Sequence, residues 1–306
     1  MFSETRAMFL YAVTPVHMGA GTAIGLIDNP IQREVHTNHP LLAGSGLKGA
    51  LRHVAEQRWG KNGLVIDLFG PASQNASEHA GALSLSDGVL VTFPVRCLKR
   101  GFVYAARLLA IAGGGTAPWS GITDPAGKAH AAGLTMAVDG KLILETFELS
   151  VTEAAAVKEA AKWLAENALP AGDEHAFFRD KLKSDLVVLP EDVFSYCVER
   201  ATVVEPHVRI DDESGTADDG GLFYTENLPP ESLMLALVMA SQVRRTGKDK
   251  TGKDKDAAKD KTGKDKDAAA VIGDVTTEFN GQLLQIGGDA TTGRGQVLLH
   301  FPREGE

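Results

Sequence analysis

Met8-Phe-Leu-Tyr-Ala-Val-Thr14 is a short apolar run that Pro15 ends, a pattern typical of a buried strand. A loop follows to about residue 43, and Ser45 then provides an N-cap for a helix that runs to about Trp59. The apolar stripe of this helix comprises Leu47, Leu51, Val54 and Ala55. The helix would place Lys48 and Arg52 together on the side away from this stripe.

The rest of the chain continues to mix the two periodicities. The expected elements, in chain order, are strands at 81–86 and 89–95 joined by an Asp87-Gly88 hairpin turn, a helix at 105–112, a strand at 142–149, a helix from a Ser150–Glu153 capping box to about Asn167, a strand at 233–239, a helix at 270–281, and strands at 283–286 and 297–301. At 306 residues the chain could form one large domain or two smaller ones.

Two strand-like segments, 203–211 and 221–227, flank an acidic, glycine-containing run. This pattern predicts a long β-hairpin over about 203–227 with a flexible tip. The clustered carboxylates lack the alternate spacing and the terminal Glu of an EF-hand loop, so a solvated tip is favoured over a calcium site.

Composition excludes several classes of protein. The chain has 306 residues and only two cysteines, Cys97 and Cys197, which are isolated and give no disulfide framework or zinc motif. The N-terminal residues lack a signal-peptide pattern, and no apolar run approaches the length of a membrane span, so we expect a cytoplasmic protein. The formal charge of −9 argues against nonspecific nucleic-acid binding by the whole surface, but a local basic face remains compatible with it.

Residues 246–269 form a low-complexity insertion. Lys248 to Ala258 and Lys259 to Ala269 are identical copies of KDKTGKDKDAA. Neither copy has a large apolar side chain, so we expect a solvated segment outside the core.

Asp28 is the leading candidate for chemistry. It lies in the loop at about 15–43, within Gly25-Leu-Ile-Asp-Asn-Pro-Ile-Gln-Arg-Glu34. Loops held by their neighbours commonly carry catalytic groups. An aspartate before Asn-Pro is also a common turn former, and this alternative stays open on the residues alone.

Two segments could hold phosphates. Lys48 and Arg52 lie four residues apart at the start of the helix from Ser45, where a lysine opposes the helix dipole unless an anion is shared. Near the C-terminus, Gly287-Gly-Asp-Ala-Thr-Thr-Gly-Arg-Gly295 lets backbone amides approach a polyanion. A solvated lysine and a tight turn region are the respective alternatives. The residues that we expect to contact phosphates in these segments are Ser45, Lys48, Arg52, Gly287, Gly288, Thr291, Thr292 and Arg294.

Several segments together resemble one family, the backbone subunit of type III-B CRISPR effector complexes, in the Cmr group of the RAMP superfamily. They run in family order outside the insertion. The segments are Thr14–Gly21, Ile27–Glu34, Gly44–Arg52, Phe93–Arg96, Arg209–Ala217, Leu222–Glu226 and the C-terminal glycine-rich loop.

The resemblance implies the α+β class and a single RAMP domain over 1–306. This domain would have a ferredoxin-like (RRM-like) core with helical insertions and a thumb hairpin at about 203–227. It further implies copies stacked in a helical filament along a CRISPR guide RNA, other Cmr subunits as partners, and cleavage of paired target RNA at regular intervals with a divalent metal, Mg or Mn. The thumb would act as a wedge that displaces a nucleotide, with Phe223 packing on bases.

The same resemblance assigns roles to individual residues. Asp28 aligns with the cleavage aspartate, as metal ligand or base, and Lys48 aligns with a guide-binding lysine. His17 and Glu226 have counterparts and are secondary catalytic candidates. Gly46 departs from similar proteins, which often carry Ser there.

Other interpretations stay open. The chain could be a noncatalytic RNA scaffold in which Asp28 only shapes its loop, or a stand-alone RAMP endoribonuclease that processes guide precursors with His17. His17 could equally be structural or contact RNA, and Glu226 could simply pair with Arg209 across the hairpin.

Overall fold

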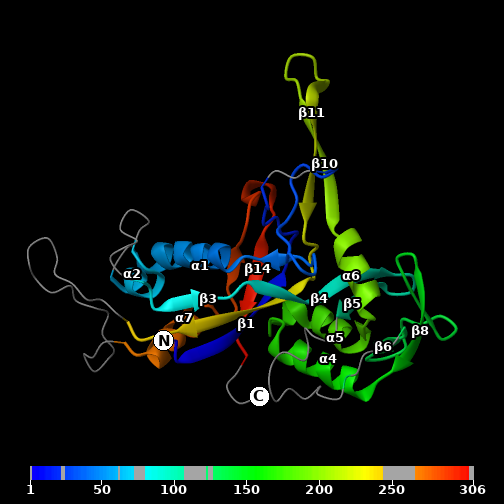
Figure 1. Cartoon of the computed structure of the whole chain (residues 1–306), viewed down its shortest axis with the longest axis horizontal. Helices are drawn as coiled ribbons and strands as arrows, with labels where there is room; N and C mark the ends of the chain where they lie inside the picture. The colour runs from blue at the N-terminus through cyan, green and yellow to red at the C-terminus, as the bar shows by residue number, and fades with distance from the viewer. Residues whose placement is uncertain are drawn as a thin grey trace, which may run out of the picture.

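The computed structural model describes residues 2–21, 25–60, 63–71, 80–106, 122, 127–243 and 266–302. One part of its large sheet is antiparallel throughout and has β1 (Glu4–Ala12) in the middle (Figure 1). The strands in spatial order are β13 (Leu283–Gln285), β14 (Gln296–His300), β1 (Glu4–Ala12), β12 (Leu233–Ala240) and β4 (Gly88–Cys97), with β3 (Leu83–Leu85) on β12 and β2 (Leu41–Leu42) on β4. Mixed helices and antiparallel strands confirm the α+β class.

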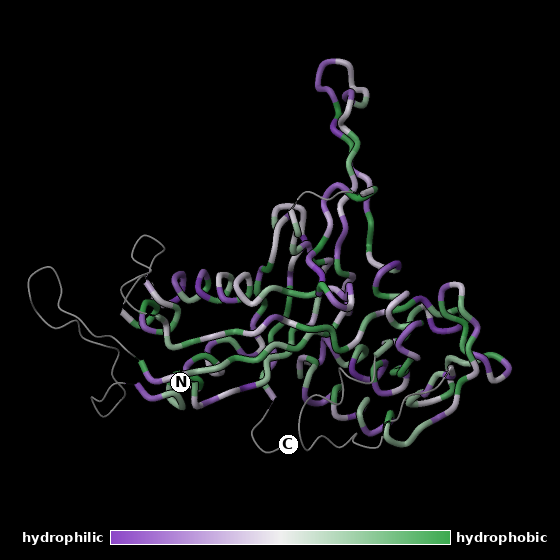
Figure 2. Tube along the Cα trace, viewed as in Figure 1, coloured by the Kyte–Doolittle hydropathy of each residue, from purple (hydrophilic) through white to green (hydrophobic). Residues whose placement is uncertain are grey.

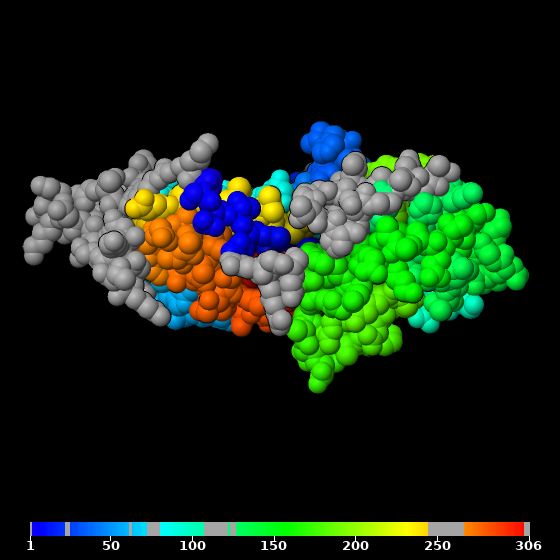
Figure 3. All heavy atoms as spheres, turned by 90° about the horizontal axis from the view of Figure 1, so that it is seen from below, coloured from blue at the N-terminus to red at the C-terminus, as the bar shows by residue number. Residues whose placement is uncertain are grey.

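Beyond β4 the strands close into a barrel-like ring. The ring runs β4, β5 (Gly101–Ala106), β9 (Leu186–Val188), β6 (Ala129–Ala131), β8 (Phe147–Glu153) and β7 (Lys141–Leu144). Cys97 on β4 pairs with Leu144 on β7 and completes the circle. Seen from the end opposite β10 and β11, this part (green) lies beside the part containing α7 (orange) and the N-terminal strand (blue) (Figure 3).

Helices cover both faces of the sheet at β1. Met8 and Leu10 pack in a core cluster with α1 (Gly44–Trp59) and α7 (Ala268–Phe279), while Phe9 and Tyr11 pack in a second cluster with α4 (Ala155–Asn167). All four side chains are at most 4% exposed. The predicted buried strand at 8–14 is therefore present, although it spans Glu4–Ala12, and its apolar run is continuous because both faces are buried. The described residues also form the helices α2 (Gly63–Phe69), α5 (Ala176–Asp185), α6 (Glu191–Arg200) and the single turns Asp173–His175 and Ala290–Thr292.

A two-stranded hairpin projects away from these layers (Figure 1). It consists of β10 (Val203–Ile210) and β11 (Ala217–Asn227), paired antiparallel with a register shift between Val208 and Ile210. The tip is hydrophilic and the stem carries apolar residues (Figure 2). The predicted hairpin is present, but β11 begins at Ala217, so its tip is shorter than the run 212–221.

The predicted hairpin at 81–95 is wrong. β3 and β4 do not pair with each other; they lie one after the other along the same edge of β12. Asp87 does not form the predicted hairpin turn. Its Oδ1 instead accepts a hydrogen bond of 2.7 Å from the N–H of Gly44. This carboxylate thus satisfies a free amide at the start of α1, a cap supplied by a residue distant in sequence.

Three predicted helix starts are also wrong. The N-cap of α1 is Ala43 rather than Ser45, and neither it nor Ala154, the N-cap of α4, makes a side-chain cap. Residues 150–153 continue β8 instead of forming a capping box, because Val151 pairs in the ring with Ala129. The predicted helix at 105–112 begins as strand β5 through residue 106, and the rest lies outside the described residues.

The insertion ends earlier than the sequence pattern indicates. Asp267 caps α7 by accepting a hydrogen bond of 2.8 Å from Ala270 N, and Ala268 is buried in the core. The last residues of the second repeat therefore belong to the helix. Residues 244–265 lie outside the described part of the chain, but Val243 N donates to Lys266 O over 3.1 Å, so the two ends of the insertion meet.

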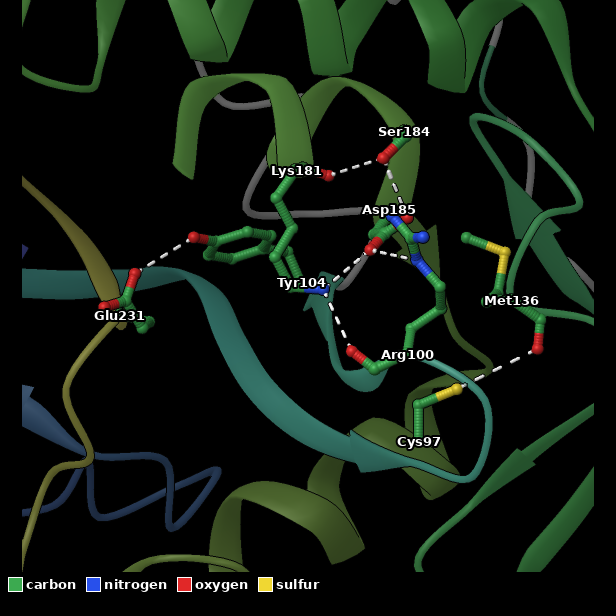
Figure 4. A network of polar contacts seen from close by, with 8 residues as sticks. All are labelled: Cys97, Arg100, Tyr104, Met136, Lys181, Ser184, Asp185 and Glu231. Atoms are coloured by element: carbon green, nitrogen blue, oxygen red, sulfur yellow. Dashed lines mark hydrogen bonds and ion pairs between the residues drawn. The ribbon is translucent and has the colours of Figure 1, made fainter. Parts of the chain in front are cut away.

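A buried ion network holds α5 against the turn between β4 and β5 (Figure 4). The fully buried Asp185 accepts hydrogen bonds from Lys181 Nζ at 2.7 Å, Arg100 Nε at 3.0 Å and Ser184 Oγ at 2.8 Å. Burial opposes ionisation of Asp185, but the hydrogen bonds from Lys181, Arg100 and Ser184 outweigh it and lower its pKa. Among the residues described, no helix is long and apolar enough to cross a membrane.

Candidate active site

The loop containing Asp28 lies along β11 as a short added strand. Asn29 N donates to Tyr224 O at 3.0 Å, and Glu226 N donates to Asn29 O at 2.9 Å, forming an isolated parallel bridge between Asn29 and Thr225. The exposed Asp28 carboxylate accepts a hydrogen bond from Tyr224 N at 2.8 Å through Oδ2. Pro206 lies opposite Tyr224 in β10. Tyr224 directs both its N–H and its C=O away from β10, as alternate residues of an antiparallel ladder do, and so bonds the loop.

Glu226 anchors this loop from inside the protein. Its side chain accepts hydrogen bonds from Ile31 N at 3.1 Å and Thr202 Oγ1 at 2.8 Å, and it forms an ion pair of 2.5 Å with Arg33. Glu226 is only 3% exposed. The suggested pairing with Arg209 is wrong, since Arg209 contacts Asp218 at 3.5 Å.

His17 connects β11 to the glycine-rich loop. Its Nδ1 lies 2.7 Å from Glu226 O, and its own carbonyl accepts a hydrogen bond of 2.8 Å from Gly288 N. A Cβ added at Gly287, whose φ is +76°, would meet His17 O at 2.1 Å. Only glycine therefore permits this approach. The structure brings His17, Asp28 and Glu226 together at residues 224–226 of β11.

The cations at the start of α1 are held by protein groups. Lys48 Nζ donates to Leu83 O at 2.9 Å, and burial, followed by the charge of Arg52, lowers the pKa of Lys48. Arg52 forms an ion pair with Glu56 at 2.8 Å and donates to Pro71 O at 3.2 Å. Ser45 is exposed. Lys48 and Arg52 are thus oriented by the fold, and their binding of RNA remains a prediction.

The glycine-rich loop is tied to the hairpin. Arg294 forms an ion pair with Glu205 near the start of β10. Thr292 Oγ1 donates to Asp289 O at 2.8 Å inside the loop, and Thr291 is exposed. Arg294 is therefore committed to a carboxylate, while the RNA-binding role of the loop stays a prediction.

The sequence assigned no role to three residues of this site: Arg33, Thr202 and Tyr224. Arg33 and Glu226 are 193 positions apart, so no local spacing could pair them. The only signal was that Arg33 lies in the same short segment as Asp28.

The Asp28 carboxylate suits a metal ion only if a substrate supplies further ligands. No group of three His, Cys, Asp or Glu residues that could hold a metal ion occurs in the described ranges. Asp28 offers one exposed carboxylate, whose Oδ1 makes no hydrogen bond to another described residue. Mg²⁺ commonly binds one or two carboxylates together with substrate phosphates and waters, so Asp28 fits a cation of this kind and not an all-protein cage.

Comparisons with known proteins agree on the family. A model of the RAMP superfamily matches residues 9–297. The CRISPR system Cmr endoribonuclease Cmr4 of Pyrococcus furiosus is 34% identical over 311 residues, which cover 95% of this chain and 93% of the relative.

Solved structures show the same fold. The crystal structure of oligomeric Cmr4 from Pyrococcus furiosus has a TM-score of 0.69 and 27% identity, with 97% of each chain covered. A cryo-EM structure of type III-B Cmr-beta bound to cognate target RNA has a TM-score of 0.72 over 98% of each chain and, at 18% identity, shows the fold alone. The chain therefore belongs to the RAMP superfamily, and within it to the Cmr4 group of type III-B CRISPR subunits.

Proposed function

We propose that this chain is a guide-binding backbone subunit of a type III-B effector complex and an endoribonuclease that cleaves guide-paired target RNA, with Asp28 as the catalytic residue. One observation carries the proposal: an exposed carboxylate is fixed on a strand-like segment at the root of a projecting hairpin. A relative named as an endoribonuclease supports the reaction class.

RNA supplies its own nucleophile, the 2′-hydroxyl. Cleavage then requires in-line geometry and proton transfer at the attacking oxygen, without a covalent protein nucleophile. Asp28 accepts that proton or positions a divalent cation, Mg²⁺ or Mn²⁺, beside the phosphate. When bound, such a cation supplies stabilisation of the charge that develops on the phosphate.

The hairpin suits the role of a thumb that separates paired nucleotides. Val208, Leu222 and Tyr224 are 45%, 54% and 37% exposed and lie on one face of the two strands. On the other face, Phe223 stacks on His207 with ring centroids 5.1 Å apart and an angle of 18°. These flat and apolar groups can pack against bases, while the acidic tip avoids phosphates.

The strand order supports a ferredoxin-like core within the larger sheet. Taken as β1, α1, β4, β12, α7 and β14, the elements follow the order strand, helix, strand, strand, helix, strand, and the strands lie side by side as β14, β1, β12 and β4. We place the guide over this core, against Lys48, Arg52 and the glycine-rich loop.

Glu226 and His17 act as positioning residues in this proposal. Glu226 is too buried to meet RNA, but it fixes Ile31 and Arg33, which follow Asp28 in the same loop. His17 holds β11 and the glycine-rich loop in register. Partners of the chain would be guide RNA, target RNA, further copies in a filament and other Cmr subunits, in the cytoplasm.

A noncatalytic scaffold is the second candidate, because the bond from Tyr224 N to Asp28 could serve only to shape the loop. The test uses a reconstituted, guide-loaded complex with Asp28→Asn, and Asp218→Asn on the hairpin as a matched control. We expect target binding to persist and cleavage to fall at least 100-fold for Asp28→Asn, in the range found for acid–base groups. EDTA should stop cleavage by the unaltered complex, and Mn²⁺ or Mg²⁺ should restore it. Undiminished cleavage by Asp28→Asn would assign the chain to the scaffold class.

A further inference from the structure

A pocket of about 530 Å³ opens at the root of the hairpin, between the segment that enters β10 and the segment that leaves β11. Arg200 and Thr202 line it from the first segment, and Glu231 lines it from the second. Arg96 of β4, Phe102 of β5 and Glu145 of the turn between β7 and β8 form further parts of its wall. Thr202 also donates to Glu226 in the candidate active site, and the other residues have no role in the proposed cleavage step.

Phe102 is a fixed aromatic surface in this pocket. Lys181 Nζ lies 4.3 Å from its ring centroid, and Tyr104 meets the ring edge-on at 5.3 Å and 78°. Lys181 is itself held by Asp185 at 2.7 Å (Figure 4). A ring with an ammonium on one side is suited to stack a planar, electron-rich group on its other side.

Two guanidinium groups provide positive charge at the pocket. Glu145 binds Arg96 in a bidentate manner, with Nε 3.2 Å from both oxygens and Nη2 2.8 Å from Oε2. This fixes the guanidinium and leaves its Nη1 with no hydrogen bond to another described residue. Arg200 is exposed at the end of α6 and makes no hydrogen bond or ion pair within the described ranges. Arginine donors in this arrangement suit a phosphate.

Glu231 adds an acceptor. Its Oε2 accepts hydrogen bonds from Tyr11 and Tyr104, the latter at 3.1 Å, while its Oε1 makes none with described residues. Glu231 and Glu145 have φ values of +69° and +48°, two of the five left-handed non-glycine residues in the described chain. Such backbone strain persists where the surroundings enforce it and concentrates at ligand sites.

We propose that this pocket binds one nucleotide, with its base stacked on Phe102, its phosphate between Arg96 and Arg200, and an amino group of the base donating to Glu231. The inference rests on the proposed function in one respect: that function makes an RNA strand at the hairpin root one source of the bound nucleotide. A free nucleotide presents the same groups and is the other source. A nucleotide in the pocket would affect the position of the Asp28 loop through Thr202. Thr202 lines the pocket and also donates to Glu226, which accepts a hydrogen bond from Ile31 N in that loop.

The test is calorimetric titration of the full chain with AMP, UMP, ribose 5-phosphate and a single-stranded adenosine octamer. We expect AMP to bind more tightly than UMP, because UMP lacks the amino donor, and ribose 5-phosphate to bind weakest. Arg200→Gln and Phe102→Leu should each weaken AMP binding roughly fivefold or more, since base stacking and charged hydrogen bonds each contribute that much. Lys141→Gln is the control for loss of charge: it removes an exposed cation, which pairs with Glu148 at 3.2 Å, from the β7–β8 hairpin outside the pocket.

The outcomes separate the sources and the two proposals. Octamer binding with the same dependence on Arg200 and Phe102 identifies RNA as the source, and binding of AMP alone identifies a free nucleotide. The inference is overturned if no probe depends on these residues, or if the substitutions change only the association state of the chain, which would indicate a protein contact. Asp28→Asn should leave AMP binding unchanged, so loss of cleavage and loss of nucleotide binding report on different sites.

Discussion

Asp28 Oδ2 accepts a hydrogen bond from the backbone N–H of Tyr224 over 2.8 Å, so one carboxylate both shapes its loop and faces solvent. The two roles can be separated by substitution. Asparagine keeps an oxygen that accepts from Tyr224, whereas alanine leaves the amide without this partner. We expect Asp28→Asn to change the free energy of unfolding by less than about 0.5 kcal/mol and Asp28→Ala to lower it by about 1 kcal/mol, with both abolishing cleavage. Urea unfolding and cleavage assays on the same preparations measure the two roles separately. Cleavage retained by Asp28→Asn would show that Asp28 only shapes the loop.

Glu226→Gln should destabilise the protein and impair cleavage without weakening guide binding. The substitution leaves Arg33, whose side chain is 14% exposed, without its counter-charge, at a cost of about 3 kcal/mol. Asp218→Asn breaks the exposed pair with Arg209 and should cost less than about 0.5 kcal/mol. Denaturant unfolding of the single variants and of Arg33→Gln/Glu226→Gln measures the coupling. Additive effects in that double-mutant cycle would contradict a direct pair.

Lys48→Ala tests the phosphate contact on α1. If Lys48 meets one phosphate, guide binding weakens and the slope of log K against log salt becomes shallower by about 0.7. Lys99→Ala is the matched control, because Lys99 also donates to a backbone carbonyl, that of Ala137 at 3.0 Å, but lies in the turn after β4. Filter binding across a salt series measures both. An unchanged slope for Lys48→Ala argues against the contact.

The buried network at Asp185 should make stability depend on acid pH. Its pKa is lowered in the folded protein, so its contribution is fully present above its unfolded pKa of about 3.9 and is lost as pH falls through the lower folded value. Asp185→Asn leaves Lys181, which is 6% exposed, without its charge partner and should cost about 3 kcal/mol at pH 7. Thermal unfolding from pH 7 to pH 3 should show the variant and the parent converging as pH falls. A constant difference over this range would refute the assignment.

The insertion should be removable up to the point where α7 begins. Deleting 246–265 keeps Val243 and Lys266, whose backbones are hydrogen-bonded, and should leave the melting temperature nearly unchanged. Deleting 246–269 also removes the Asp267 cap and the buried Ala268, and should cost about 1–2 kcal/mol. Equal stability of the two deletions would mean that this cap contributes nothing measurable.

Local patterns predicted much of the fold. The apolar run at 8–14 became β1, the stripe Leu47, Leu51 and Ala55 faces the core, and the hairpin at 203–227 is present. The errors share one cause: Asp87-Gly88 and Ser150–Glu153 have strong local turn and cap propensities, and pairing with distant strands overrode them.

By itself, the sequence determined the α+β class, the family and the leading candidate residue, because periodicity and motifs are local and survive without knowledge of pairing. Only the tertiary structure decided that Glu226 is a buried anchor for Arg33 rather than a partner of Arg209, and that Phe102, Arg96, Arg200 and Glu231 share a pocket. Those relationships join residues far apart in the chain, and a buried ion pair or a cavity wall is set by which strands meet and not by any spacing along the sequence.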